Sequence, residues 1–169
     1  DKNKTTIFFE SQKYLKWFIF SPINVSMTPK EFCSLLENKF PYEPTISQRK
    51  WFLEVSDFLF SKNSNTVFVL KGYAGTGKTT LIGSLVDQLK HIGFRSVLLA
   101  PTGRAAKVMT NYSKVSAFTI HKKIYYPKLK NSGKIFFKLK PNKHKKTVFI
   151  IDEASMIGDD SKSSAFFEN

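Results

Sequence analysis

The chain has 169 residues, of which 41% are hydrophobic and 24% are charged. This length fits one domain or slightly more, and the composition excludes a wholly disordered or a fibrous protein. Cys33 is the single cysteine, so no internal disulfide can form, and the three histidines do not have a zinc-binding spacing. No segment approaches the ~20 apolar residues that span a bilayer, and no secretory signal is recognisable. We therefore expect a cytoplasmic protein with no membrane partner.

The formal net charge of +14 comes from one part of the chain. Between Asp87 and Asp152 there are 15 lysine and arginine residues and no acidic residue. A basic surface interleaved with aromatic residues is typical of nucleic-acid binding. The alternative is an ordinary solvated face in a lysine-rich chain, and charge alone does not decide between the two. The densest part, residues 122–146, mixes lysines with Tyr125, Tyr126, Phe136 and Phe137.

Residues 1–26 show no clean period and no motif, and we treat them as an N-terminal extension of unknown role. The compact unit is expected to be residues 27–169. It should begin with a helix, because Thr28 can cap its start, Pro29 suits its first position and Glu31 completes a capping box. The apolar residues that follow at helical spacing are Phe32, Leu35, Leu36 and Phe40.

A second helix should follow the break at Pro41 and Pro44. Thr45 and Gln48 repeat the capping-box pattern at its start. Its apolar positions are Trp51, Phe52, Val55, Phe58 and Leu59.

Three short apolar runs, residues 67–70, 97–100 and 148–151, are too continuous for half-exposed strands. We expect them to be buried parallel strands. Between the first two runs, an apolar stripe at helical spacing ends at Gly93 and completes a βαβ unit, so we predict an α/β fold. The stripe consists of Leu81, Ile82, Leu85, Val86 and Leu89.

The region after the second predicted strand contains shorter elements. Residues 103–109 and residues 116–124 have the pattern of short helices. Residues 125–139 have the pattern of a hairpin that turns at residues 131–133, where the sequence is Asn-Ser-Gly.

Residues 72–79 match the pattern G-x-x-x-x-G-K-[ST] between a predicted strand and a predicted helix. Glycines let the backbone N–H groups point inward, and the helix adds its positive N-terminal end, so such a loop can hold phosphate oxygens. Lys78 would reach the β- and γ-phosphates, and the Thr79 hydroxyl would hold Mg²⁺. Average composition produces this pattern by chance in only ~0.6% of chains this long. The predicted nucleotide-binding residues of this loop are Gly72, Gly75, Thr76, Gly77, Lys78, Thr79 and Thr80.

Asp152 and Glu153 directly follow the apolar run 148–151, which is the Walker B pattern. Asp152 would position Mg²⁺, mostly through water, and Glu153 would orient or deprotonate the water that attacks the γ-phosphate. Alone, such a pair could be a charge pair at a helix N-terminus, but the phosphate loop upstream favours the catalytic interpretation. The predicted catalytic residues are therefore Lys78, Asp152 and Glu153, and the predicted Mg²⁺ ligands are Thr79 and Asp152.

Four segments together resemble superfamily 1 DNA helicases of the RecD-like branch. Residues 72–79 are close to the first motif of that family, and residues 100–106, Ala-Pro-Thr-Gly-Arg-Ala-Ala, to its motif Ia. Residues 119–121, Thr-Ile-His, look like motif Ib, and residues 152–156 look like motif II. Gln48 is placed like the adenine-reading glutamine of the Q motif. The order and spacing agree, and motif Ia is far more specific than the phosphate loop alone.

The resemblance implies a RecA-like P-loop NTPase motor domain, with a parallel sheet flanked by helices and the nucleotide at the carboxyl ends of the strands. It implies ATP and Mg²⁺ as cofactors, and a helicase that moves 5′-to-3′ on single-stranded DNA. Gln48 would then contact the adenine edge. The plainer alternative for Gln48 is a capping-box residue, and both roles are compatible.

The resemblance also implies a single-stranded DNA track on this chain. Pro101, Thr102 and Arg104 would lie along it, with Arg104 gripping phosphates, and Thr119 and His121 would contact the same strand. The plainer alternatives are a solvated Arg104 on a helix and a structural His121. The basic residues 122–146 would lie near the DNA face.

The chain departs from the family after Walker B. The Gly-Asp-x-x-Gln segment of the family has no match before Asn169, and the second motor domain is absent. We therefore expect a fragment, truncated before the domain is complete, that binds nucleotide weakly and hydrolyses it poorly. Two alternatives stay open: a P-loop ATPase that remodels a non-DNA client, and a nucleotide-sensing module that binds nucleic acid.

Overall fold

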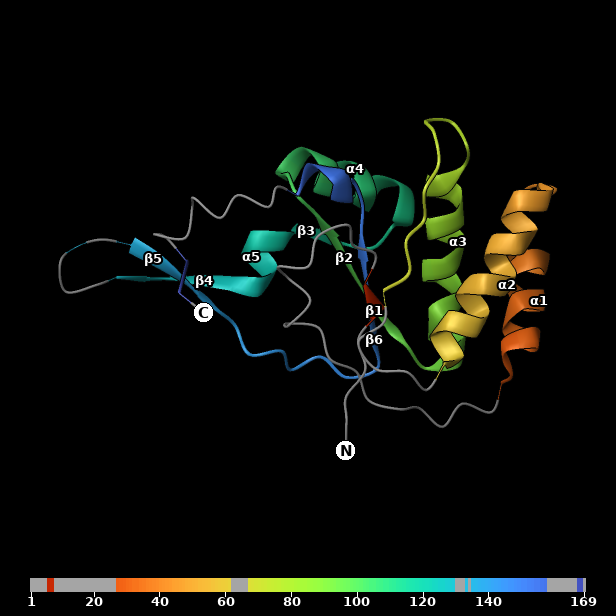
Figure 1. Cartoon of the computed structure of the whole chain (residues 1–169), viewed down its shortest axis with the longest axis horizontal. Helices are drawn as coiled ribbons and strands as arrows, with labels where there is room; N and C mark the ends of the chain where they lie inside the picture. The colour runs from red at the N-terminus through yellow and green to blue at the C-terminus, as the bar shows by residue number, and fades with distance from the viewer. Residues whose placement is uncertain are drawn as a thin grey trace.

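The computed structural model describes residues 6–7, 27–61, 67–129, 133, 135–157 and 167–168. A parallel sheet lies at its centre, and each strand in it runs parallel to its neighbours (Figure 1). The second and third predicted strands are therefore present, and they are parallel neighbours in the sheet. The order of the sheet is β1 (Thr6–Ile7), β6 (Thr147–Ile151), β2 (Arg95–Ala100) and β3 (Ala117–Thr119).

Both faces of this sheet are buried. On one face, Leu98 and Ile150 belong to the main apolar core that the helices cover. On the other face, Leu99 and Phe149 pack in a second cluster with α5 (Ile120–Ile124). Successive side chains of a strand point to opposite faces, so a strand buried on both sides is apolar at every position. This explains the continuous apolar runs in the sequence.

Helices α1 (Pro29–Lys39) and α2 (Ile46–Phe60) begin at the predicted capping boxes. The Glu31 N–H donates to the Thr28 hydroxyl at 3.2 Å, and the Thr28 N–H donates to the Glu31 carboxylate at 2.6 Å. The Thr28 N–H bond, followed by a bond that the Thr28 hydroxyl donates to the same carboxylate at 2.8 Å, holds the pKa of Glu31 below its usual value, because both stabilise the charged carboxylate. The same exchange of bonds starts α2. In Figure 1 the two helices lie side by side at one end of the molecule.

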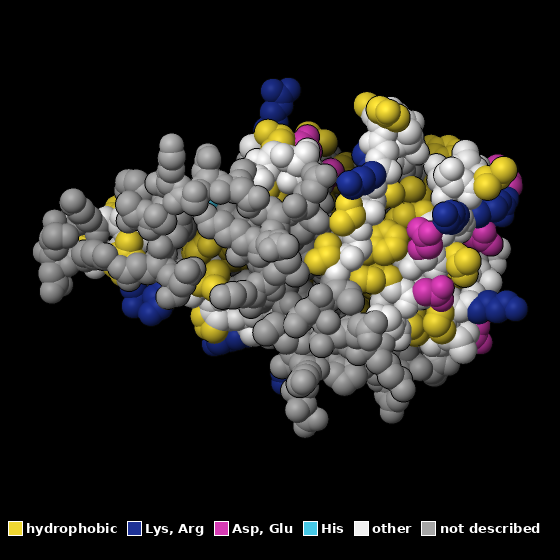
Figure 2. All heavy atoms as spheres, viewed as in Figure 1, with side chains coloured by type: hydrophobic (Ala, Val, Ile, Leu, Met, Phe, Trp, Pro, Cys, Tyr) yellow, Lys and Arg dark blue, Asp and Glu magenta, His cyan; other side chains and the backbone are white. Residues whose placement is uncertain are grey.

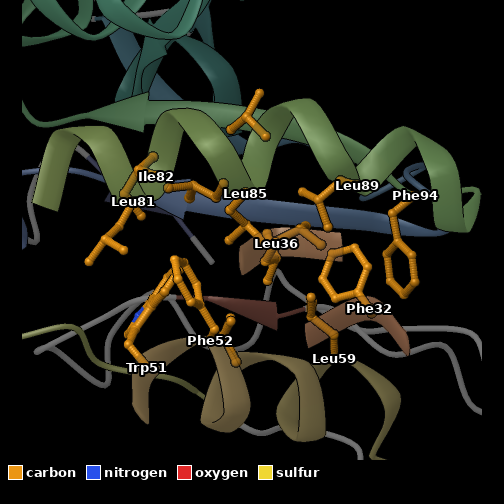
Figure 3. Packing of buried hydrophobic residues seen from close by; sticks show 14 of the residues in the cluster. Phe32, Leu36, Trp51, Phe52, Leu59, Leu81, Ile82, Leu85, Leu89 and Phe94 are labelled. Atoms are coloured by element: carbon orange, nitrogen blue, oxygen red, sulfur yellow. The ribbon is translucent and has the colours of Figure 1, made fainter. Parts of the chain in front are cut away.

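Helix α3 (Lys78–Leu89) lies between this helix pair and the sheet (Figure 1). It continues into a short 3₁₀ turn, η2 (Lys90–Ile92), and stops at Gly93 as predicted. Gly93 has a φ of +72°, a left-handed conformation that favours glycine at the end of a helix. Figure 3 shows side chains of α1, α2 and α3 meeting in the main core. Among them are Phe32, Leu36, Trp51, Phe52, Leu59, Leu81, Leu85 and Leu89.

Residues 67–70 do not form a strand of the sheet, so this prediction was wrong. Val67 makes an isolated β-bridge, and the next three residues are irregular. The edge of β6 that does not pair with β2 is instead paired with β1. Val69 is 45% exposed, while Phe68 and Leu70 are partly buried against the main core. The apolar run therefore reflects packing of alternate side chains on the core rather than pairing within the sheet.

The prediction of a helix over residues 116–124 was only half correct. Its first half is strand β3, which pairs with the edge of β2, and only its second half is helical, as α5. The Ala117 N–H also donates to the Thr110 hydroxyl at 2.9 Å. Pairing with a strand that is distant in sequence therefore overrides the local helical pattern. The preceding helix, α4 (Gly103–Ser113), continues past its predicted end at residue 109.

The predicted hairpin is confirmed. Strands β4 (Tyr125–Leu129) and β5 (Ile135–Leu139) are antiparallel, with Tyr125 opposite Leu139. Gly133 has a φ of +75° near the turn, while residues 131 and 132 lie outside the described residues. Strand β7 (Phe167–Glu168) runs parallel to β5. Figure 1 shows the hairpin projecting at the end of the molecule opposite to α1 and α2.

The described residues of the predicted N-terminal extension are Thr6 and Ile7, so the division of the chain at residue 27 stays a prediction. In the part of the chain that the structure describes, no helix is both long and apolar enough to cross a membrane.

Candidate nucleotide-binding site

The phosphate loop leads directly into α3. Gly75 and Gly77 have φ values of +79° and +83°, so both adopt a left-handed conformation that other residues rarely take. At Gly72 a Cβ atom would lie 2.8 Å from the Thr76 hydroxyl oxygen, which leaves no room for a side chain. Gly77 precedes α3 without any side-chain cap, so the first N–H groups of this helix have no side-chain acceptor at the N-cap. This is the backbone arrangement that suits a bound anion.

Lys78 reaches back over the loop from the first turn of α3. Its ammonium donates to the carbonyl oxygens of Gly72 and Tyr73, each at 2.6 Å. The Thr76 hydroxyl donates to the same Tyr73 carbonyl at 2.8 Å and tightens the turn. The positive charge of Lys78 therefore lies on the inner side of the curve that the loop makes. This position suits an interaction with phosphate oxygens.

Gln48 joins α2 to the phosphate loop. Its side-chain oxygen accepts a hydrogen bond from the Thr45 N–H at 2.9 Å, which confirms the capping role. Its side-chain nitrogen donates to the Thr76 carbonyl at 3.4 Å. A Cβ atom at Gly77 would lie 2.8 Å from the same nitrogen. Gln48 is therefore next to the loop, and its predicted contact with adenine stays a prediction.

Asp152 and Glu153 stand at the carboxyl end of β6. The Asp152 N–H donates to the Leu99 carbonyl at 3.1 Å and extends the pairing of β6 with β2. One carboxylate oxygen of Asp152 accepts from the Glu153 N–H at 2.9 Å, and the other accepts from the Tyr112 hydroxyl at 2.9 Å. Glu153 is exposed and has a φ of +54°, a strained conformation for a residue other than glycine. It precedes the short turn η3 (Ala154–Met156).

Tyr112, near the end of α4, is half-buried beside these acids. Burial, together with the negative charge of Asp152 and the hydrogen bond to it, raises the pKa of Tyr112 well above its usual value. The hydroxyl therefore stays protonated at neutral pH and remains a donor. No sequence motif pointed to Tyr112, because it lies 40 residues from Asp152 along the chain.

The phosphate loop and the end of β6 line one cavity of about 400 Å³. All three predicted catalytic residues, Lys78, Asp152 and Glu153, are among its lining residues, together with Gly72. Its apolar wall comes from Val69, Leu70, Ile82, Met109, Ile150 and Ile151. The other predicted loop residues, Gly75, Thr76, Gly77, Thr79 and Thr80, lie in the same loop and in the first turn of α3, outside this lining.

The predicted Mg²⁺ ligands are a hydroxyl and a carboxylate, the oxygen donors that Mg²⁺ prefers. Thr79 is exposed on the first turn of α3, and Asp152 lines the cavity beside Lys78. Each Asp152 carboxylate oxygen accepts one hydrogen bond, from the Glu153 N–H or the Tyr112 hydroxyl, which leaves each oxygen a second lone pair for a metal ion. The donor chemistry of these residues therefore fits Mg²⁺.

The predicted DNA-contacting residues follow β2 and β3, which are neighbours in the sheet. Thr102 caps α4 by accepting from the Ala105 N–H at 3.2 Å, and Thr119 caps α5 by accepting from the Lys122 N–H at 3.4 Å. Pro101 is half-buried before this cap, and Arg104 is exposed in the first turn of α4. Because parallel strands end at one edge of a sheet, these residues and Asp152 share the edge where the nucleotide cavity lies.

A second cavity, of about 480 Å³, lies where α5 meets the hairpin. The exposed ring of His121 stacks on Tyr125 with 5.9 Å between ring centroids. The Lys140 ammonium donates to the Lys122 carbonyl at 2.8 Å across the same region. In the view of Figure 2, most acidic side chains lie over α1 and α2, at the opposite end from the hairpin. The lining residues are Thr119, His121, Lys122, Tyr125, Tyr126, Pro127, Phe137 and Lys140.

The chain is similar in sequence to a known protein family. Residues 58–167, which include the phosphate loop and Walker B, match the AAA domain family. The chain belongs to this family. The match agrees with the fold, a parallel sheet flanked by helices as in RecA-like P-loop NTPase domains.

Characterised relatives include two helicases. The chain is 34% identical over 91 residues to the ATP-dependent RecD2 DNA helicase of Deinococcus radiodurans. The aligned region covers 54% of this chain and 12% of that protein. It is 36% identical over 90 residues to the ATP-dependent DNA helicase dda of enterobacteria phage T4, covering 52% of this chain and 20% of that protein. The chain thus spans a fifth or less of the length of these two relatives.

The chain also resembles the uncharacterised protein MJ1519 of Methanocaldococcus jannaschii. The two are 31% identical over 155 residues, which covers 79% of this chain and 13% of that protein. No solved structure matches the chain. The family and the helicase relatives together support the superfamily 1 resemblance that the motifs indicated.

Proposed function

We propose that this chain is the nucleotide-binding part of an ATP-dependent DNA helicase that hydrolyses MgATP to move along single-stranded DNA. The observation that carries the proposal is the single cavity that Lys78 of the phosphate loop lines together with Asp152 and Glu153, which follow β6. A P-loop lysine and a Walker B acid pair on one cavity form the two halves of an ATPase site. The two helicase relatives support the DNA-linked form of this activity.

The chemistry would be the transfer of the γ-phosphoryl group of ATP to water. The phosphate loop and Lys78 would hold the β- and γ-phosphate oxygens and offset their negative charge. Glu153, which is exposed and lines the cavity, would accept a proton from the water that attacks the γ-phosphorus. The bond between that phosphorus and the β–γ bridging oxygen breaks, and ADP and phosphate are the products. Thr79 and Asp152 would hold Mg²⁺, which supplies further neutralisation of the phosphate charge when it is bound.

The placement of the predicted DNA contacts supports single-stranded DNA as the track. Thr102 follows β2, and Thr119 is the last residue of the neighbouring strand β3, at the edge of the sheet that also carries Asp152. The second cavity continues from Thr119 to aromatic and basic side chains of the hairpin. Aromatic rings that can stack on bases, together with lysines that can pair with phosphates, suit a single strand. Polarity 5′-to-3′ follows from the resemblance to the RecD-like branch alone.

The test is ATP hydrolysis by the complete gene product that contains this chain, with and without single-stranded DNA, at two salt concentrations. We expect DNA to raise the rate many-fold, and the higher salt concentration to weaken the effect, because phosphate contacts release counterions. A substantial rate that is indifferent to DNA would instead indicate an ATPase with another client. DNA binding without any turnover would favour a nucleotide-sensing module.

A further inference from the structure

Tyr112 lies outside the predicted motifs, yet its hydroxyl is hydrogen-bonded to Asp152, the first acid of the Walker B pair. Its hydroxyl donates to one carboxylate oxygen of Asp152 at 2.9 Å, while the neighbouring Glu153 N–H donates to the other oxygen at 2.9 Å. The carboxylate is therefore held by one local bond and by one bond from α4. The first bond comes from the next residue in the chain, whereas the second depends on the position of the end of α4.

The end of α4 is tied firmly to the structure around it. The Ser113 hydroxyl closes the last turn of α4 by donating to the Met109 carbonyl at 2.7 Å, and Met109 itself is fully buried in the main core. One turn earlier, the Thr110 hydroxyl accepts from the Ala117 N–H at the start of β3. The Tyr112 ring itself packs against the main core. Because the ring packs against the core near the end of this helix, its hydroxyl has a defined position relative to Asp152.

We propose that Tyr112 is a positioning residue for Asp152, which it holds in the orientation that binds Mg²⁺ with the nucleotide. The inference rests on the proposed function, because it assigns Asp152 to the metal. Outer hydrogen-bond partners of metal-binding carboxylates orient the ligand and tune its affinity. Without the Tyr112 hydroxyl, the Asp152 side chain would keep only its bond to the Glu153 N–H and would sample other rotamers. Nucleotide held by the phosphate loop alone would not depend on Tyr112.

The experiment compares Tyr112→Phe with the wild type in the complete gene product that contains this chain. Tyr112→Phe removes the hydroxyl and keeps the ring, so the packing against the core is preserved. Binding of a fluorescent ATP analogue is titrated with Mg²⁺, and again in the presence of EDTA. We expect the Mg²⁺ midpoint of the variant to rise roughly tenfold, as for other outer-shell partners of metal ligands. Affinity in EDTA should stay within about twofold, since Lys78 and the loop are unchanged.

Two controls separate positioning from a merely structural role. Tyr42→Phe makes the same chemical change at a side chain that is 70% exposed in the loop between α1 and α2, and it should leave both titrations unchanged. In an Asp152→Asn background, Tyr112→Phe should cause little further change in the Mg²⁺ midpoint, because Tyr112 acts through Asp152. Thermal unfolding of each variant reports whether the fold is intact.

The outcomes distinguish this inference from the proposed function. A wild-type Mg²⁺ midpoint in Tyr112→Phe, or an equal loss of affinity with and without Mg²⁺, would overturn the positioning role while leaving the ATPase proposal intact. Equal effects of Tyr112→Phe in the wild-type and Asp152→Asn backgrounds would also overturn it. A wild-type chain that binds the analogue without any Mg²⁺ dependence would overturn the inference and the assignment of Asp152 together.

Discussion

Gln48 and Gly77 are so close that a Cβ atom on Gly77 would lie 2.8 Å from the side-chain nitrogen of Gln48. The same nitrogen donates to the carbonyl of Thr76, the residue before Gly77. The start of α2 is therefore packed directly on the phosphate loop. Gln48 therefore caps α2 and also contacts the loop that leads into α3. Gly77 leaves space for the Gln48 side chain because glycine has no Cβ atom.

The first prediction compares alanine at two glycines of the loop. Gly75→Ala and Gly77→Ala both place a side chain on a left-handed residue, which costs about 1 kcal/mol each. Gly77→Ala must also displace the Gln48 amide, whereas a Cβ at Gly75 meets nothing within 4 Å. We expect Gly77→Ala to lose about 0.5 kcal/mol more in the free energy of unfolding, measured with urea, because the flexible Gln48 side chain can move aside and gives up only its bond to the Thr76 carbonyl. In a Gln48→Ala background the difference between the two variants should vanish, and its persistence would contradict this account.

The second prediction separates the two roles of Gln48. Gln48→Glu keeps an acceptor for the Thr45 N–H, so the capping box and the stability should survive. It removes the side-chain donor that reaches the loop, and with it the amide that would read adenine. We expect the preference for ATP over GTP to fall, as measured by competition with a fluorescent nucleotide. Unchanged preference in a stable Gln48→Glu variant would leave Gln48 as a capping residue only.

The third prediction concerns Lys78. Lys78→Ala should lower ATP turnover of the complete gene product at least ~100-fold, because the variant loses charge stabilisation of the transferred phosphoryl group. Lys90→Ala is the matched control, since Lys90 is an exposed lysine in the 3₁₀ turn η2 that directly follows the same helix. Steady-state hydrolysis rates check both. Turnover of Lys78→Ala within a few-fold of the wild-type rate would refute the phosphate-loop assignment.

The fourth prediction tests the DNA track. Arg104→Gln should weaken affinity for single-stranded DNA and reduce the slope of log K against log salt by about one phosphate contact. Lys50→Gln removes the same charge from an exposed site on α2, where Lys50 pairs with Glu54 at 3.7 Å, and should leave the slope unchanged. Fluorescence anisotropy at several salt concentrations gives both slopes. Equal slopes for wild-type and Arg104→Gln would exclude Arg104 from the track.

The fifth prediction follows from His144. Burial, followed by the positive charges of Lys123 and Arg95, holds the pKa of His144 below its usual value of 6.5. Just below pH 6.5, His144 is therefore protonated more fully in the unfolded chain than in the folded chain. Above pH 6.5 the imidazole is mostly neutral in both states and does not affect the free energy of unfolding. Below pH 6.5 that free energy falls as the pH falls, because protonation favours the unfolded chain. We expect His144→Gln to lose less stability than the wild type between pH 7.5 and pH 5.5. Thermal unfolding at the two pH values checks this, and identical losses would contradict it.

Local patterns of the sequence predicted the elements that depend on neighbouring residues. The capping boxes of Thr28 and Thr45 formed because each needs only residues within one helical turn. The hairpin and the left-handed glycine after α3 are local in the same sense. The phosphate loop and Walker B could also be predicted, because each is a short contiguous segment and their placement on α3 and β6 follows from an α/β sheet.

Long-range pairing decided what the sequence pattern could not. Residues 67–70 and 117–119 are both short segments, yet residues 117–119 pair with β2 as β3, whereas β6 pairs with β1 and residues 67–70 form no strand. The bond from Gln48 to the phosphate loop spans 28 residues, and the bond from Tyr112 to Asp152 spans 40. Hydrogen bonds between separate elements depend on where helices end in space, and no local periodicity encodes that. The sequence by itself therefore determined the motifs and the chemistry they imply, whereas the tertiary structure decided which side chains hold those motifs in place.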